Sequence, residues 1–200
     1  MKQIEPRLAG HDNNIIITHP DSNYYFIPIV KNASSQAYAF LNHYGWKYYE
    51  YENTEEIKNK IPFTILREPV ERWCSGFAQD FHRDVSALEY RTRLDNIFNN
   101  KLGSTMHTRK QSFYLENYDL DKIHFLKHGA TLSRSLVRFT KEIMKLRIFS
   151  PMQNEKSVMD YAVKDKIKKV LEENPKYLEL LKDYLRKDLE IYNNVNFYNG

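Results

Sequence analysis

The sequence predicts an α/β fold in which a mostly parallel central sheet is flanked by helices, within one domain spanning residues 1–200. Short runs rich in β-branched and aromatic residues alternate with stretches of helical periodicity. No repeat, low-complexity tract or Gly/Ser-rich linker separates them. The 200 residues, of which 42% are hydrophobic, are enough for one well-buried core.

The predicted strands are short apolar runs at residues 14–18, 24–30, 46–51, 62–66 and 122–126. A helix is predicted after the second run, over residues 34–44, and Gly45 supplies its stop. Another follows the fourth run, because Pro69 suits a first helical turn and Val70, Trp73 and Phe77 recur at helical spacing. Since ligands of such sheets bind at the carboxyl ends of the strands, both strand-to-helix junctions should open at that edge.

Two long helices are predicted to close the chain, at about residues 155–172 and 175–193. The second would begin with Asn174 as its cap and Pro175 at its first position. Its leucines recur at helical spacing and form an apolar stripe.

Composition bears on three properties of the protein: its cysteine chemistry, its relation to membranes and the charge of its ligands. Cys74 is the only cysteine, which excludes an internal disulfide and fits a reducing, cytoplasmic location. The longest apolar runs fall far short of the roughly 20 residues that cross a membrane, so no membrane partner is expected. Residues 101–150 hold 10 Lys/Arg against 4 Asp/Glu, which suits an anionic ligand or a solvated basic face. No nucleic-acid-binding motif accompanies that surplus.

The stretch FIPIVKNASSQAYAF places a lysine and two hydroxyls at the first junction. Backbone N–H groups at a helix N-terminus attract an anion, Ser34 and Ser35 add hydroxyl donors, and Lys31 adds a charge. The spacing is not that of a Walker A loop, since the glycines are missing and the lysine precedes the loop. An ordinary serine-capped helix is the alternative interpretation.

The second junction, FTILREPVERWCSGF, carries Arg67 at the strand end and Ser75 on the following helix. An arginine offers a planar fork to a phosphate, and the serine can hydrogen-bond the same group. Pairing of Arg67 with Glu68, Glu71 or Glu142 is the alternative. Two anion-competent junctions on neighbouring strands suit a ligand with two separated phosphates.

At these two motifs the chain resembles the sulfotransferases that use 3′-phosphoadenosine 5′-phosphosulfate (PAPS), and it is nearest to their carbohydrate branch. KNASS is similar to the family's 5′-phosphosulfate loop, and Arg67 with Ser75 matches its 3′-phosphate motif. The resemblance implies a P-loop-NTPase-like sulfotransferase fold. It also implies that Lys31, Asn32, Ala33, Ser34, Ser35 and Gln36 contact the nucleotide.

The likeness extends more weakly over residues 24–193. HTRKQ resembles the family's H-x-x-P-Q element, with Lys110 where proline is usual, and PMQNEKS resembles a segment near the nucleotide. The first implies substrate binding by Arg109, Lys110 and Gln111, which could face a sugar acid or sulfate. The second implies nucleotide binding by Asn154 and Ser157.

The resemblance implies in-line transfer of a sulfuryl group from PAPS to a hydroxyl or amine of a carbohydrate or small molecule. The product nucleotide would be adenosine 3′,5′-bisphosphate (PAP), and no metal is implied. Lys31 would stabilise charge on the leaving phosphate or, alternatively, only anchor the bound phosphate. Ala33 stands where the family has glycine, and a small side chain suffices there if the backbone keeps an ordinary negative φ.

Four residues are candidates for the base. Glu52 and Glu50 lie at the end of the strand after the phosphate-loop helix, and either could instead be a solvated strand-end carboxylate. His107 lies in the H-x-x-P-Q-like element, where positioning the substrate is as plausible, and His43 sits near a helix end. A PAP/PAPS-binding module without catalysis is the main alternative function. A kinase is a further one, although the Walker A loop it would need is absent from the sequence.

Overall fold

The computed structural model describes residues 1–5, 12–52, 54–84, 92, 98, 102, 105–148 and 160–199. The chain divides into two compact units. Unit 1 contains Met1–Arg67, Gln111–Glu155 and Asn194–Gly200, and unit 2 contains Glu68–Lys110 and Lys156–Asn193. That the chain forms one domain stays a prediction, and each unit is described by itself.

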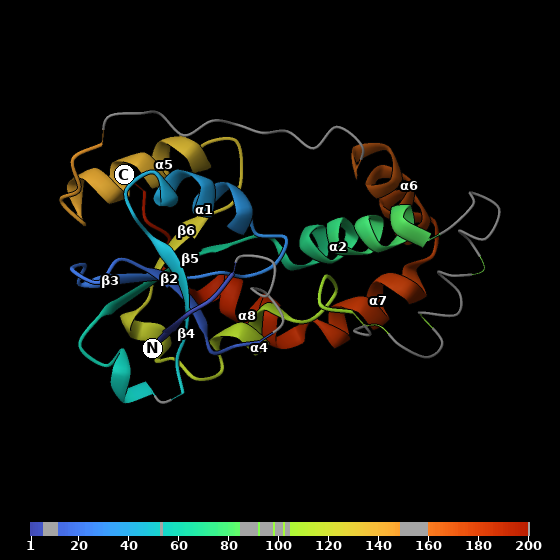
Figure 1. Ribbon diagram of the computed structural model, residues 1–200. Helices are drawn as coiled ribbons and strands as arrows, with labels where there is room; N and C mark the ends of the chain where they lie inside the picture. The colour runs from blue at the N-terminus through green and yellow to red at the C-terminus, as the bar shows by residue number, and fades with distance from the viewer. Residues whose placement is uncertain are drawn as a thin grey trace. The chain divides into compact units, whose positions relative to one another are not determined.

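The α/β class is confirmed by the sheet of unit 1, which has six strands in the described ranges (Figure 1). The strands are β1 Lys2–Gln3, β2 Ile15–Thr18, β3 Tyr24–Ile27, β4 Lys47–Glu50, β5 Ile61–Leu66 and β6 His124–Lys127. Their order is β1-β4-β2-β3-β5-β6. All five predicted strands are therefore present within a few residues of their expected bounds.

The prediction of a mostly parallel sheet is wrong, because the sheet is mixed. β3–β5 and β5–β6 are parallel pairs, whereas β2–β3, β2–β4 and β1–β4 are antiparallel. Only residues 19–23 join β2 to β3, and so short a connection cannot make the crossover that parallel neighbours need. β2 consequently runs between β4 and β3 in the opposite direction to both.

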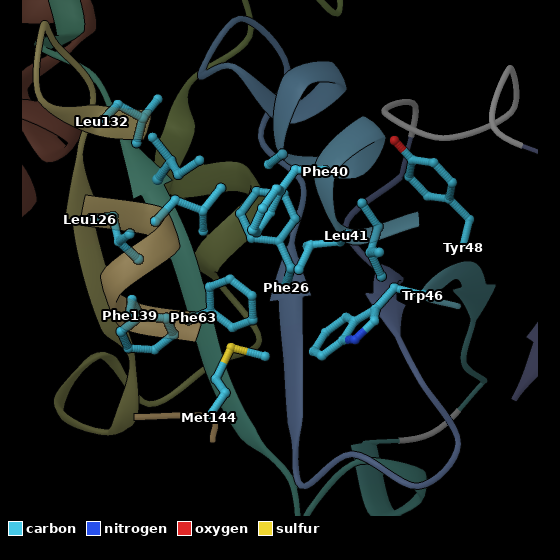
Figure 2. Close-up of a cluster of buried hydrophobic side chains, with 14 of the residues drawn as sticks. Phe26, Phe40, Leu41, Trp46, Tyr48, Phe63, Leu126, Leu132, Phe139 and Met144 are labelled. Carbon is cyan, nitrogen blue, oxygen red and sulfur yellow. The ribbon is translucent and has the colours of Figure 1, made fainter. Parts of the chain in front are cut away.

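One face of this sheet is covered by α1 Ser34–Asn42 and α5 Leu132–Glu142 (Figure 1). Between sheet and helices lies an aromatic core, in which the Phe63 ring is 5.2 Å from Phe26 and 5.1 Å from Phe139 (Figure 2). Alternation along the strands explains this face, since Ile15 and Ile17 join the same cluster. The other face carries residues such as Tyr25, whose ring lies 6.0 Å from that of Tyr118.

The helix after the first junction ends as expected. Gly45 has φ 82°, a left-handed conformation that glycine adopts at no steric cost, and its N–H donates to the carbonyl of Asn42. The chain turns back after Gly45, where the N–H of Trp46 donates to the carbonyl of Leu41. The Trp46 side chain is buried in the core.

The regular elements in the described part of unit 2 are helices, and residues 105–110 form turns. Its helices are α2 Pro69–Asp84, α6 Asp160–Glu173, α7 Pro175–Tyr184 and α8 Arg186–Asn194. Trp73 and Phe77 of α2 pack with Ile167 and Leu171 of α6 in a buried cluster. Glu71 of α2 forms ion pairs with Lys164 and Lys168 of α6.

The single helix predicted over residues 175–193 is divided at Leu185 into α7 and α8. Pro175 does occupy the first turn of α7, as predicted. Asn174 precedes the helix, but its side chain makes no cap bond there, because Nδ2 donates instead to the carbonyl of Val170 in α6 at 2.7 Å. None of the helices in the described ranges has both the length and the apolar character that crossing a membrane requires.

Residue His124 of β6 makes the stability of the protein sensitive to acid. Its ring lies 5.4 Å from Phe139, and burial lowers the pKa of His124 below its ordinary value. The unfolded chain therefore takes up this proton at a higher pH than the folded chain, so the contribution to stability is present above pH about 6.5 and is lost as the pH falls through the folded pKa. Urea unfolding of His124→Gln between pH 7.5 and 5 should show a smaller loss of stability than the wild type. Ala39→Gln, which introduces the same side chain at an exposed position without a titratable group, is the control and should keep the wild-type slope.

Candidate functional site

The first junction, residues 28–33 between β3 and α1, has an unusual backbone. Lys31 has φ 69° and Ala33 has φ 61° with ψ 25°, both in the left-handed region. Asn32 between them is not among the positive-φ residues, and Ser34 begins the helix, so the sign of φ alternates along Lys31–Ser34. Alternation of this kind is the backbone pattern of anion-binding nests, and we call Lys31–Ser34 the nest. The Asn32 N–H itself donates to the carbonyl of Ile29 at 3.1 Å, so that donor is used within the turn.

Ala33 was expected to replace the family's glycine only if its backbone kept a negative φ, and that condition is not met, because its φ is positive. A left-handed residue with a Cβ costs roughly 1–2 kcal/mol, and such strain persists only where the surroundings fix the conformation. The serine-capped alternative is also wrong, because Ala33 itself occupies the N-cap and makes no side-chain cap bond. Ser34, Ser35 and Gln36 form the first turn of α1, where N–H groups lack partners within a helix.

The strained loop is held by Asn32, which is only 1% exposed. Its Nδ2 donates to the carbonyl of Ile65 in β5 at 2.7 Å and to Oε1 of Gln111 at 2.6 Å. Both partners are acceptors, so they settle which end of the amide is nitrogen. Among the described residues, the remaining atom, Oδ1, is buried without a hydrogen-bond partner and can accept a bond from a bound donor.

Gln111 joins the two junctions. Its Nε2 donates to the carbonyl of Arg67 at 3.0 Å, and its Oε1 accepts the Arg67 N–H at 3.3 Å. Arg67 Nη1 in turn donates to the carbonyl of Lys31 at 3.3 Å. Because β3 and β5 are parallel neighbours, their carboxyl ends meet at one edge of the sheet. Four site residues predicted on three separate stretches, Lys31, Asn32, Arg67 and Gln111, are thus brought together within unit 1.

Relief of the strain at Ala33 is measurable. Ala33→Gly should raise the free energy of unfolding by about 0.5–1 kcal/mol. Glycine adopts a positive φ freely, which removes the strain of the folded state, but its greater freedom in the unfolded chain offsets part of this stabilisation. Ala39→Gly, on the exposed side of the same helix, should have the opposite sign by a similar amount. Equal destabilisation of both variants in urea unfolding would contradict the left-handed conformation.

The predicted glutamate bases are placed as strand-end carboxylates. Glu50 is the last residue of β4, where Asn14 Nδ2 approaches its Oε1 at 3.5 Å, and Glu52 is exposed just beyond. The carboxyl ends of β4 and β3 lie at the same edge of the sheet, but β2 lies between the two strands. The distance from β4 to β3 is therefore two strand spacings, or about 10 Å. His43 lies at the far end of α1 from Lys31, so it does not belong to this edge.

The remaining candidates belong to unit 2 or lie outside the described residues. Ser75 lies on α2 and is 7% exposed. Asn154 and Ser157 lie outside the residues that the structure describes. The Lys110 ammonium sits 4.6 Å from the centroid of the Tyr184 ring. Burial, followed by the charge of Asp188, raises the pKa of Tyr184, which keeps the phenol protonated beneath that cation.

His107 has a partner that the sequence prediction missed. Its Nδ1 lies 2.5 Å from Oδ1 of Asp80, and Oδ2 of the same carboxylate accepts from Thr105 Oγ1 at 2.5 Å. Asp80 lies on α2, four residues after Gly76 and eight after Arg72. The sequence shows that Arg72, Gly76 and Asp80 share one face of a helix, because they are spaced four residues apart. It does not show that this face contacts the segment that contains His107.

Comparison with protein-family models, with curated proteins and with solved structures finds no match for the chain. Within the described ranges, no group of three or more His, Cys, Asp or Glu side chains is placed to hold a metal ion. The geometry above is therefore the basis for assigning a function.

Proposed function

We propose that the chain is a PAPS-dependent sulfotransferase that acts on a hydroxyl or amine of a carbohydrate or small-molecule acceptor. One observation carries the proposal: a strained, glycine-free nest at Lys31–Ser34 is held beside Arg67 by buried amides. Backbone strain of this kind concentrates where a ligand is clamped. The mixed sheet of unit 1 would then be a variant of the P-loop-like sulfotransferase fold.

The loop and the adjacent strand end bind PAPS in the proposed reaction. The N–H groups at the start of α1 and the hydroxyls of Ser34 and Ser35 bind the 5′-phosphosulfate of PAPS, where the helix dipole also favours an anion. Lys31 neutralises the phosphate, and Arg67, at the adjacent strand end, binds the other phosphate group.

The transfer forms one bond and breaks another. The acceptor oxygen forms a bond to sulfur as it gives its proton to a base, and the bond between sulfur and the bridging oxygen breaks. Its electron pair stays on the departing PAP, where Lys31 stabilises the growing charge. Cys74, the only cysteine in the sequence, is buried, and the lack of a second cysteine for a disulfide is in keeping with the reducing, cytoplasmic location that forms part of this proposal.

Thermal unfolding in the presence of nucleotides tests the proposal. PAP at 100 times its Kd should stabilise the protein by roughly 2.7 kcal/mol, which for this length raises Tm by roughly 5–10 °C. A rise with ATP and Mg²⁺ but none with PAP would overturn the assignment in favour of a kinase. A rise with PAP, but no turnover of PAPS across a panel of glycans and phenols, would instead favour the PAP/PAPS-binding module.

A further inference from the structure

The side chain of Gln111 lies where the two junctions of unit 1 meet. Gln111 is the first residue of α4 Gln111–Leu115, and it is 2% exposed. Its Nε2 donates to the carbonyl of Arg67 and its Oε1 accepts the Arg67 N–H, so one amide holds both main-chain groups of that residue. The same Oε1 accepts a hydrogen bond from Nδ2 of Asn32. One buried side chain therefore ties the strand end at Arg67 to the loop that contains the nest.

Two further bonds connect the same two junctions. Arg67 Nη1 donates to the carbonyl of Lys31 at 3.3 Å, and Asn32 Nδ2 donates to the carbonyl of Ile65, two residues before Arg67. The nest and the end of β5 cannot move apart unless bonds to Asn32, Arg67 and Gln111 break. The protein itself therefore sets the distance between the nest and the guanidinium of Arg67.

The two junctions also lie where the connections of the sheet reverse direction. From β3 the chain continues through α1 to β4 on one side of β3, and from β5 it continues to β6 on the other side. Ligands of open α/β sheets bind beside such a switch point, at the carboxyl ends of the strands. The bridge made by Gln111 thus joins the two strands between which a ligand of this sheet is expected.

We infer that Gln111 determines specificity: it fixes the distance between the nest and Arg67, so that the site selects a nucleoside bisphosphate by the spacing of its two phosphates. The inference rests on the proposed function, in which the nest and Arg67 each bind one phosphate group. A ligand with the matching spacing forms charge-assisted hydrogen bonds at both places, whereas a ligand with another spacing forms them at one place only. Gln111 acts through Arg67 and Asn32, so it is a positioning residue.

The bridge requires a side chain that both donates and accepts. Asn32 and the Arg67 N–H bring two donors to position 111, and the Arg67 carbonyl brings an acceptor. The amide of glutamine satisfies all three. A carboxylate would only accept, and it would also place a negative charge beside a site for anions. An aliphatic side chain forms none of these bonds.

Two isomers of equal charge, PAP and adenosine 2′,5′-bisphosphate, test the spacing in the wild-type protein. Titration calorimetry should show PAP bound on the order of 10- to 100-fold more tightly, the worth of one hydrogen bond to a charged group. Equal affinity for the two isomers would overturn the inference without any variant and would leave the proposed function standing. No binding of PAP would defeat the proposed function and this inference together.

Removal of the bridge supplies the second readout. Gln111→Leu should lower the preference for PAP over its isomer by about tenfold. The affinity for adenosine 5′-monophosphate, which has no second phosphate for Arg67, should change less. Gln3→Leu makes the same change at an exposed position of β1 in the same unit, and it should keep the wild-type preference. A purely structural role would weaken all three nucleotides by one common factor, and that result would overturn the inference.

Discussion

Replacement of Lys31 by alanine should lower kcat for sulfuryl transfer by on the order of 10²- to 10³-fold, the usual cost of removing one donor from developing transition-state charge. The left-handed backbone of Lys31 and the bond from Arg67 Nη1 to its carbonyl hold its main chain at the nest. Alanine would keep the same backbone strain, so the variant removes only the side chain that we propose to act on the leaving phosphate. Steady-state kinetics with PAPS measure the effect.

The two roles considered for Lys31 separate in these kinetics. A lysine that stabilises the leaving phosphate lowers kcat when removed, whereas one that only anchors bound PAPS raises KM and leaves kcat nearly unchanged. Lys58→Ala, which removes an exposed lysine paired with Glu55, is the matched control and should behave as the wild type. Near-normal kcat/KM in Lys31→Ala would contradict both roles.

The second large effect is expected for Gly76→Ala. The new Cβ would lie 2.0 Å from the carbonyl oxygen and 2.6 Å from the carbonyl carbon of His107, and both are backbone atoms that cannot rotate away. Helix α2 and the segment that contains His107 must separate, which should cost about 3 kcal/mol or more. For a protein of this length, that corresponds to a fall in Tm of roughly 6–12 °C.

Gly129→Ala is the matched control, because in the described part of the chain no atom beyond Gly129 and its two chain neighbours lies within 4 Å of a Cβ built there. Its free energy of unfolding should stay within about 0.5 kcal/mol of the wild type. Equal stability of the two variants would show that the helix and the segment do not meet at Gly76.

Local sequence signals predicted the strands and the junctions, because each of these features depends only on neighbouring residues. An apolar run followed by Lys31 or Arg67 marks a strand end whatever the rest of the fold does. The direction of β2 was missed, although the short connection over residues 19–23 is visible in the sequence and favours a hairpin. The break at Leu185 was missed because its apolar stripe continues through it.

The candidate site was harder to predict where it depends on backbone angles or distant partners. Alanine carries no sequence signal for positive φ, so the conformation of Ala33 comes from its surroundings and not from its own preference. The resemblance implies that Gln111 binds the substrate, whereas the structure places its amide between Asn32 and Arg67. Contacts of this kind join residues dozens of positions apart, and no periodicity reports them.

The amide bridge between Asn32, Gln111 and Arg67 has a thermodynamic consequence for any ligand of the nest. Their side chains and backbone groups are already held before a ligand arrives, by bonds to one another and to Ile65. Ordering one mobile side chain on binding costs about 0.5–1.5 kcal/mol, and a preorganised loop avoids that cost for each of them. Severing the bridge with Gln111→Leu would therefore weaken the PAP binding that we propose, chiefly through the entropy of binding, although Gln111 need not touch the nucleotide at all.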